Sequence, residues 1–187
     1  MSLRRGFKKE ANEYAREMRS ELGLAPHDPL CPWRLADHMG YTVRKLSEYR
    51  AAHPEGVSYL LSGPGQRAFS ALAFYTEDFA VIVHNDAHHP RRQAADIAHE
   101  LAHGLLLHRP APLTGVDGSR LYDWEQEDEA NWLGPAILVS EEAAIFIAES
   151  QQSAADACQL YNVSNDLLQM RLRMTNAFVR VARRRAA

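Results

Sequence analysis

The segment 94–108 constrains this chain more than any other, because it carries the letters HELAH at positions 99–103 inside a run that favours a helix. Residues four apart lie one turn apart on the same face of a helix. His99 and His103 can therefore direct two imidazoles at one ion, and Glu100, about 100° round the helix, can hold a water on it. This pattern is typical of zinc hydrolases whose glutamate is the general base. It predicts His99 and His103 as metal ligands and Glu100 as the catalytic residue.

The apolar surroundings of this motif indicate a helix that is largely buried against a sheet. A buried histidine needs a polar partner, because burying its ring without one is costly, and a metal ion would satisfy one nitrogen of each ring. The apolar residues of the segment are Ala94, Ala95, Ile97, Ala98, Leu101, Ala102, Leu105 and Leu106.

Length and composition predict one globular domain over residues 1–187, with 46% hydrophobic and 24% charged residues. The net charge of −3 argues against a dedicated nucleic-acid binder, which usually carries a basic excess. Cys31 and Cys158 are not in metal-binding spacing. The first ten residues lack the apolar core of a signal peptide, and no run reaches the ~18–20 apolar residues of a membrane span. We therefore expect a cytoplasmic protein that does not enter the membrane.

Three segments rich in β-branched and aromatic residues predict strands: Val57–Leu61, Phe69–Thr76 and Phe79–Asn85. The letters SGPG at 62–65 and the short link at 77–78 are turn signals that favour hairpins between them. Residues 41–43 favour the start of a further strand. We expect an α+β fold, in which a small, largely antiparallel three-stranded sheet packs against the HExxH active-site helix.

Apolar residues at helical spacing predict additional N- and C-terminal helices. Gly134-Pro135 lies inside one of them and predicts a kink or a break, because a mid-helix proline removes a hydrogen bond. Ser140 favours the start of a further helix. Residues 153–187 are expected to form a helical hairpin appended to the domain. The predicted helices are Arg4–Leu22, Pro32–Met39, Glu125–Leu138, Ala154–Tyr161 and Ser164–Arg183.

A catalytic zinc site usually has a third protein ligand, which must come from outside the motif helix. His108 does not fit the H-E-x-x-H-x-x-G-x-x-H pattern, because Leu106 occupies the glycine position and the third histidine comes one residue early. We interpret His108 as a residue of the helix end. The acidic cluster at 125–129 supplies the alternatives, which are Glu125, Glu127, Asp128 and Glu129.

Glu127 and Asn131 lie four residues apart and share a helix face, whereas Glu129 points elsewhere. Glu127 could bind the metal while Asn131 accepts the N–H of a ligand histidine and orients its ring. The same acidic residues could instead complement the dipole of a helix N-terminus.

Two blocks of the sequence resemble the ImmA/IrrE-type zinc metallopeptidases. They are residues 99–108 (HELAHGLLLH) and 127–140 (EDEANWLGPAILVS). The second block of the family usually ends in Leu-Met-Pro, whereas Val139-Ser140 stands in place of Met-Pro here. Weaker similarity runs from about Ala11 through the predicted strands to residues 91–93, and again over 161–172.

The resemblance implies a minimal thermolysin-like core with one zinc ion per chain, in a gluzincin-like HExxH…E arrangement. It implies that His99, His103 and Glu127 bind the ion and that Glu100 is the general base. It also implies a protein substrate, namely a helix-turn-helix transcriptional repressor cleaved in a stress or mobile-element regulatory switch. The sequence does not distinguish zinc from manganese or iron.

A group that stabilises the oxyanion of the tetrahedral intermediate is also expected, and Tyr122, His108 and Tyr161 are the candidates among which the sequence does not choose. Two other functions remain open. The chain could be a zinc-bearing regulatory protein that binds and inactivates a repressor without cleaving it. It could also be a DNA-binding module, since residues 154–161 and 164–173 could imitate a helix-turn-helix, although Leu167 and Leu168 suit a packed hairpin better than a groove-facing helix.

Overall fold

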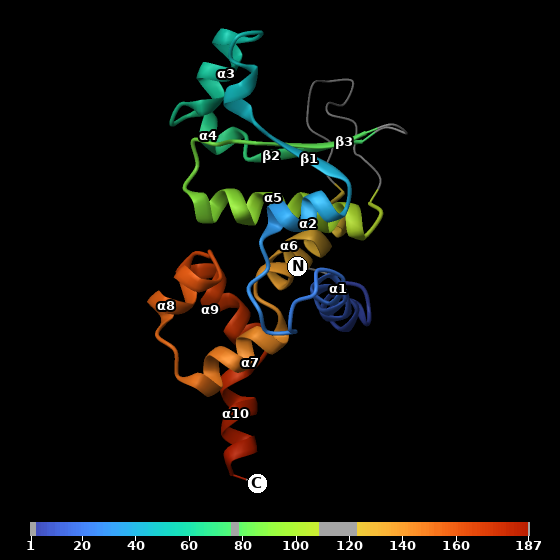
Figure 1. The fold of residues 1–187 in the computed structure, drawn as a ribbon, viewed down its shortest axis with the longest axis vertical. Helices are drawn as coiled ribbons and strands as arrows, with labels where there is room; N and C mark the ends of the chain where they lie inside the picture. The colour runs from blue at the N-terminus through green and yellow to red at the C-terminus, as the bar shows by residue number, and fades with distance from the viewer. Residues whose placement is uncertain (1–2, 76–78, 109–122, 187) are drawn as a thin grey trace.

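The computed structural model describes residues 3–75, 79–108 and 123–186, with a small sheet towards one end of the molecule and the C-terminal helices at the other (Figure 1). The fold is α+β. The strands are β1 (Tyr41–Lys45), β2 (Ala71–Tyr75) and β3 (Ala80–His84). A short 3-10 helix, η1 (Leu46–Tyr49), follows β1. The ten α-helices of the described residues are α1 (Phe7–Glu21), α2 (Pro32–His38), α3 (Pro54–Leu61), α4 (Gly65–Ala68), α5 (Pro90–Leu105), α6 (Trp124–Leu138), α7 (Glu141–Ser150), α8 (Ala154–Leu160), α9 (Asn165–Met174) and α10 (Ala177–Arg185).

The sheet is mixed, in the order β1-β3-β2, and not largely antiparallel as the sequence predicted. β2 pairs antiparallel with β3, as expected for a hairpin, but β1 pairs parallel with β3, with Tyr41 opposite Ala80. Parallel neighbours need a long crossover, and the segment with α3, α4 and β2 supplies it. Figure 1 shows α5 along one side of the sheet and α3 and α4 on the other.

The third strand is β1, because Val57–Leu61 lies in helix α3 and the strand prediction there was wrong. Pro54 occupies the first turn of α3, where its missing N–H costs nothing. Val57, Leu60 and Leu61 then lie at helical spacing and pack with Leu46 and with residues of the central strand β3 such as Val83. Val57, Tyr59 and Leu61 of the same segment alternate at strand spacing, so a short apolar run alone does not separate the two structures.

Helices α5 and α6 meet at Gly134, which sets how closely they approach. A Cβ atom on Gly134 would lie 3.1 Å from both the Cα and the backbone nitrogen of His99. Only glycine lets the backbone of α6 touch that of α5 without displacing it. The buried residues Ile97 and Leu101 of α5 and Leu133 and Ile137 of α6 form one apolar cluster around this crossing. The crossing therefore places the first half of α6 beside the motif on α5.

The sequence predicted a kink or a break at Gly134-Pro135, and the break does not occur, because helix α6 continues through Pro135. The carbonyl of Asn131, four residues earlier, loses its helical donor, but Asn131 is exposed and water can replace the bond. The C-terminal end of α6 is held by Arg19, a fully buried residue of α1. Its guanidinium donates to the carbonyl oxygens of Ile137 and Leu138, which lie in the last turn of α6.

The C-terminal part contains a second apolar cluster, built from the end of α6 and from α7 to α10. The predicted helix Ser164–Arg183 is divided into α9 and α10. Asn176 adopts a left-handed backbone with φ 52°, a conformation that Asn tolerates better than most residues, and this ends the first helix. No helix of the part described combines the length and apolarity needed to span a bilayer.

Candidate metal centre

Three side chains from two helices converge on one point. His99 and His103 come from α5 and Glu127 from the first turn of α6, and their ligand atoms all lie within 4.8 Å of one another. The two Nε2 atoms are 3.0 Å apart, and Glu127 Oε2 lies 3.4 Å from Nε2 of His99. The side chains are between 19% and 29% exposed, so both water and a substrate can reach them.

This arrangement fits a zinc ion. Tetrahedral zinc with Zn–N bonds of about 2.0–2.1 Å separates two nitrogen ligands by roughly 3.3 Å, close to the observed 3.0 Å. Two imidazoles and one carboxylate are also a ligand set of catalytic zinc, which leaves the fourth position for water. Two ring nitrogens facing each other at this distance cannot both carry a proton, so at least one presents its lone pair to the cluster.

The electrostatic environment favours a neutral His103. Burial lowers the pKa of His103, and the positive charge of His99 lowers it further. Burial also lowers the pKa of His99, but the hydrogen bond to Glu127 and the negative charges of Glu100 and Glu127 outweigh that effect and raise it. A neutral imidazole is the form that binds a metal.

The end of α5 brings His108 back over His103. Leu107 has a left-handed backbone with φ 53°, His108 N–H donates to the carbonyl of His103, and Leu107 N–H donates to the carbonyl of Gly104. These two bonds form a Schellman motif. Glycine usually occupies the left-handed position, and a leucine there costs about 1 kcal/mol. Leu107 is 88% exposed, so its side chain gains little from packing.

His108 and Glu129 continue a hydrogen-bonded chain outward from the metal ligands. Nδ1 of His103 lies 2.9 Å from Nδ1 of His108, and Nε2 of His108 lies 3.3 Å from Glu129 Oε2. Arg4 donates to the other oxygen of Glu129 at 2.7 Å. A carboxylate only accepts, so His108 carries its proton on Nε2 and accepts the N–H of His103 at Nδ1. His103 is thereby held in the tautomer whose Nε2 lone pair faces the cluster.

Glu100 lies between the cluster and the sheet. Its Oε2 accepts the backbone N–H of Ala73 in β2 at 2.9 Å. Asn85 and Ser70 form the residue pair next to Ala71 and His84, and Asn85 N–H donates to the carbonyl of Ser70. In an antiparallel pair every second residue points its backbone N–H and C=O at the partner strand, so Ser70 and Leu72 point theirs at β3. Ala71 and Ala73 therefore direct their backbone groups outward, along the edge of the sheet next to Glu100.

The structure does not bring every predicted residue to this cluster. Asn131 is exposed and makes no hydrogen bond to a ligand histidine within the described ranges, so His108 and Glu129 occupy the outer positions that we assigned to Asn131. Tyr161 is buried in the C-terminal apolar cluster, where its hydroxyl donates to the carbonyl of His27 at 2.7 Å. Tyr122 lies outside the described residues. Of the two oxyanion candidates among the described residues, His108 lies beside the metal cluster and Tyr161 does not.

Sequence reasoning missed the contact between His108 and Glu129. Glu129 was assigned to a different helix face from Glu127, and that is correct, but the face it points to contains His108. One signal was available: Pro110 follows two residues after His108, and proline commonly comes shortly after a helix end. A helix that ends before His108 allows its ring to fold back on the preceding turn.

A comparison with protein families identifies a match over more than half of the chain. The family model described as IrrE N-terminal-like domain, Peptidase_M78, matches residues 64–173. The match begins just before α4 and ends in α9, so it includes α5 and α6. The elements outside it are α1, α2, β1, η1, α3 and α10. No curated protein and no solved structure matches the chain.

Proposed function

Because the chain belongs to the Peptidase_M78 family of IrrE N-terminal-like domains, we propose that it is a zinc-dependent metallopeptidase that hydrolyses peptide bonds in a protein substrate. One observation carries the proposal beyond the family: His99, His103 and Glu127 converge from two helices. Glu100, the neighbour of His99, directs its carboxylate towards the outward edge of β2.

The residues of this chain divide the work of amide hydrolysis. His99, His103 and Glu127 would hold the ion, which supplies a Lewis acid that lowers the pKa of a water and polarises a carbonyl. Glu100 accepts the proton of the attacking water and returns it to the leaving amine. The bond from Ala73 N–H holds the carboxylate of Glu100 at the edge of β2. His108 keeps His103 in the required tautomer.

The edge of β2 supplies a binding surface for an extended peptide. Outward-facing backbone groups of an edge strand bind a peptide by adding it as a further strand. Ala71 presents its N–H and carbonyl there and Ala73 presents its carbonyl, while Ala73 N–H is already bonded to Glu100, so a peptide paired at this edge passes the general base. Short side chains at these two positions leave room for a substrate backbone.

The substrate we propose is a helix-turn-helix transcriptional repressor, whose cleavage would act as a regulatory switch in the cytoplasm. The support is the resemblance of residues 99–108 and 127–140 to the ImmA/IrrE-type peptidases. A regulatory protein that binds the repressor without cleaving it would use the same zinc site, and only a cleavage assay separates the two.

The test uses the purified chain and a repressor encoded beside its gene. Wild type should hold about one zinc per chain, and His99→Ala should abolish binding. Glu100→Gln should keep the metal, because Glu100 is not a ligand, and should lose nearly all cleavage. Glu125→Gln is the matched control, since Glu125 is an exposed residue of α6.

Cleavage should stop when a chelator is added and return with zinc. Equal turnover by wild type and Glu100→Gln would end the general-base assignment. Stoichiometric binding of the repressor with no cleavage by wild type would favour the non-cleaving regulatory protein.

A further inference from the structure

A second polar cavity lies on the side of α6 that carries Trp132. It encloses about 460 Å³ between α1, α6, α9 and α10, a volume typical of small-molecule sites. Its lining includes Arg171 and Trp132, together with Lys8, Arg180 and Arg183. None of the three metal-cluster side chains lines it, so this cavity is separate from the proposed active site.

The cavity contains a buried arginine whose hydrogen-bonding capacity is largely unused. Arg171 is 1% exposed, and only its Nε donates to an acceptor within the described residues, the carbonyl oxygen of Val139. Its Nη2 is buried and has no partner there. Burial lowers the pKa of Arg171 to about 10, so the side chain stays charged at neutral pH.

Arg19 shows how this chain otherwise treats a buried guanidinium. Arg19 is 0% exposed, and each of its three nitrogens donates to at least one carbonyl oxygen. Burying a charge without partners is costly, and a buried guanidinium normally finds acceptors. The difference between the two arginines indicates that an acceptor for Arg171 comes from outside the described residues.

Trp132 adds a second unpartnered donor to the same cavity. Its side chain is 7% exposed, and the indole Nε1 is buried without an acceptor in the part of the chain described. The ammonium of Lys8 lies 4.6 Å from the centroid of the indole ring. A lysine side chain has a flexible stem, so Lys8 can move aside for a ligand and then neutralise its charge.

The charge of the lining favours an anion. Four cationic side chains line the cavity, Lys8, Arg171, Arg180 and Arg183, against one carboxylate, Glu141. That carboxylate is already engaged, because Arg180 lies 2.8 Å from one oxygen and Asn12 donates to the other at 3.0 Å. Glu141 also interacts electrostatically with Arg171, so this one carboxylate is shared by at least two of the four cations.

We propose that this cavity binds a small organic anion whose carboxylate or phosphate group accepts hydrogen bonds from Arg171 and Trp132. Lys8 and Arg183 lie at the same cavity and supply the remaining positive charge. The proposal is independent of the peptidase assignment, because it rests on different residues.

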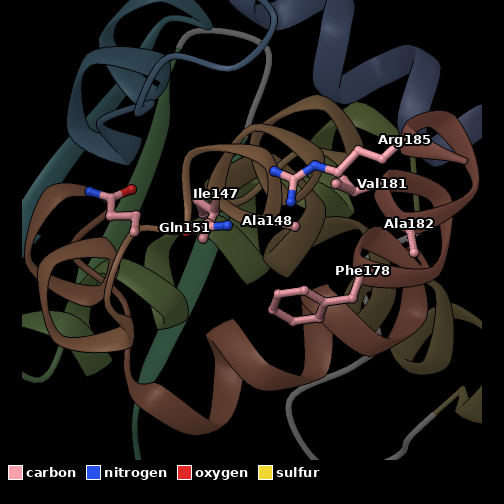
Figure 2. Close-up of a pocket in the computed structure, with 8 residues that line it drawn as sticks. Ile147, Ala148, Gln151, Phe178, Val181, Ala182 and Arg185 are labelled. Carbon is pink, nitrogen blue, oxygen red and sulfur yellow. The ribbon is translucent and has the colours of Figure 1, made fainter.

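The cavity between α7 and α10 provides the contrast. It encloses about 410 Å³, and Figure 2 shows Ile147 and Ala148 on one side of it and Phe178, Val181 and Arg185 on the other. Its lining is mainly apolar, and among the described residues its buried unpartnered polar atom is the side-chain oxygen of Gln152, an acceptor. Of these two cavities, the one between α1, α6, α9 and α10 is therefore the one whose lining residues include buried donors without a partner, Arg171 and Trp132.

The test titrates the whole chain with inorganic phosphate and with citrate in a non-anionic buffer, against sodium chloride at equal ionic strength. The readout is the set of indole N–H signals in a 1H–15N spectrum, of which the chain has three. Trp132→Phe identifies the Trp132 signal by its absence. We expect this signal to shift saturably with phosphate, with citrate or with both, and the stronger of the two defines the ligand class.

Three variants locate the site. Arg183→Gln and Trp132→Phe should each weaken binding about tenfold, as measured by calorimetry, because a hydrogen bond or contact to a charged group is lost. Arg184→Gln makes the same charge change outside the lining, where Arg184 pairs with Glu149, and should stay within about twofold of wild type. An unshifted Trp132 signal with both anions overturns the proposal. Equal weakening by Arg183→Gln and Arg184→Gln does so too, since it would indicate non-specific charge.

Discussion

Replacing His108 by phenylalanine tests the hydrogen-bonded chain behind the metal ligands. The ring keeps its approximate size but loses both nitrogens, so His103 Nδ1–H loses the acceptor that lies 2.9 Å away. His103 is only 19% exposed, and water replaces the lost acceptor poorly. Leaving a buried donor unpaired costs about 1–2 kcal/mol, which is roughly a 5- to 30-fold loss of zinc affinity. Removing an outer hydrogen-bond partner of a ligand histidine typically costs about 10- to 100-fold, which agrees with this range.

The assay is competition for zinc against a chromophoric chelator at neutral pH. His38→Phe is the control, because it makes the same chemical change at a surface histidine paired with Glu21. Glu129→Gln should weaken zinc affinity in the same direction, since His108 and Arg4 face different oxygens of Glu129 and glutamine replaces one of the two with an NH2 group that cannot accept. Thermal unfolding of the metal-free variants checks that the fold is intact. Zinc affinities of His108→Phe and His38→Phe that are equal would refute the argument.

Further predictions separate ligands, packing and distant residues. Glu127→Ala should lower zinc affinity severely, whereas Asn131→Ala should leave it within about twofold, because Asn131 is exposed. Chelator competition measures both affinities, and a large loss in Asn131→Ala would show that Asn131 orients a ligand histidine. Gly134→Ala should lower the free energy of unfolding by about 1–3 kcal/mol in denaturant titration, because the added Cβ meets the backbone of α5 at 3.1 Å. Gly104→Ala should cost less, since its Cβ meets the side-chain hydroxyl of a tyrosine that can shift, and an equal cost would contradict the close-approach explanation. Tyr161→Phe should lower stability by about 1 kcal/mol through the lost bond to a backbone carbonyl while peptide cleavage stays unchanged; a large fall in kcat would return Tyr161 to the active site.

The motif helix was predictable because its information is local. The apolar spacing of residues 94–106 indicates a buried helix, and the spacing of His99 and His103 defines one face. α5 covers this segment, and Glu127 lies with the two histidines. The same local rules erred at Val57–Leu61, where five apolar-rich residues fit either periodicity and the proline that starts α3 decided the outcome.

The outer part of the site was not predictable, because it depends on tertiary geometry. The contact from His103 to His108 requires a left-handed backbone at Leu107, and the sequence has neither glycine nor asparagine at that position to indicate it. The contact from His108 to Glu129 requires the crossing of α5 and α6, which Gly134 controls from another turn of α6. Gly134 was considered only as part of the Gly134-Pro135 pair that predicted a kink or a break, since a close approach between helices has no sequence period.

The parallel pairing of β1 with β3 has a consequence for the order in which the chain folds. Tyr41 meets Ala80 about 40 residues later, whereas β2 and β3 are neighbours in sequence. By loop-closure entropy, joining β1 costs roughly 2 kcal/mol more than closing the β2–β3 hairpin. The bond from Ala73 to Glu100 lies within one contiguous segment that also contains β3. The edge of β2 that faces the general base can thus assemble before β1 docks. The segment that does so also contains Glu100 and two of the three predicted metal ligands, His99 and His103.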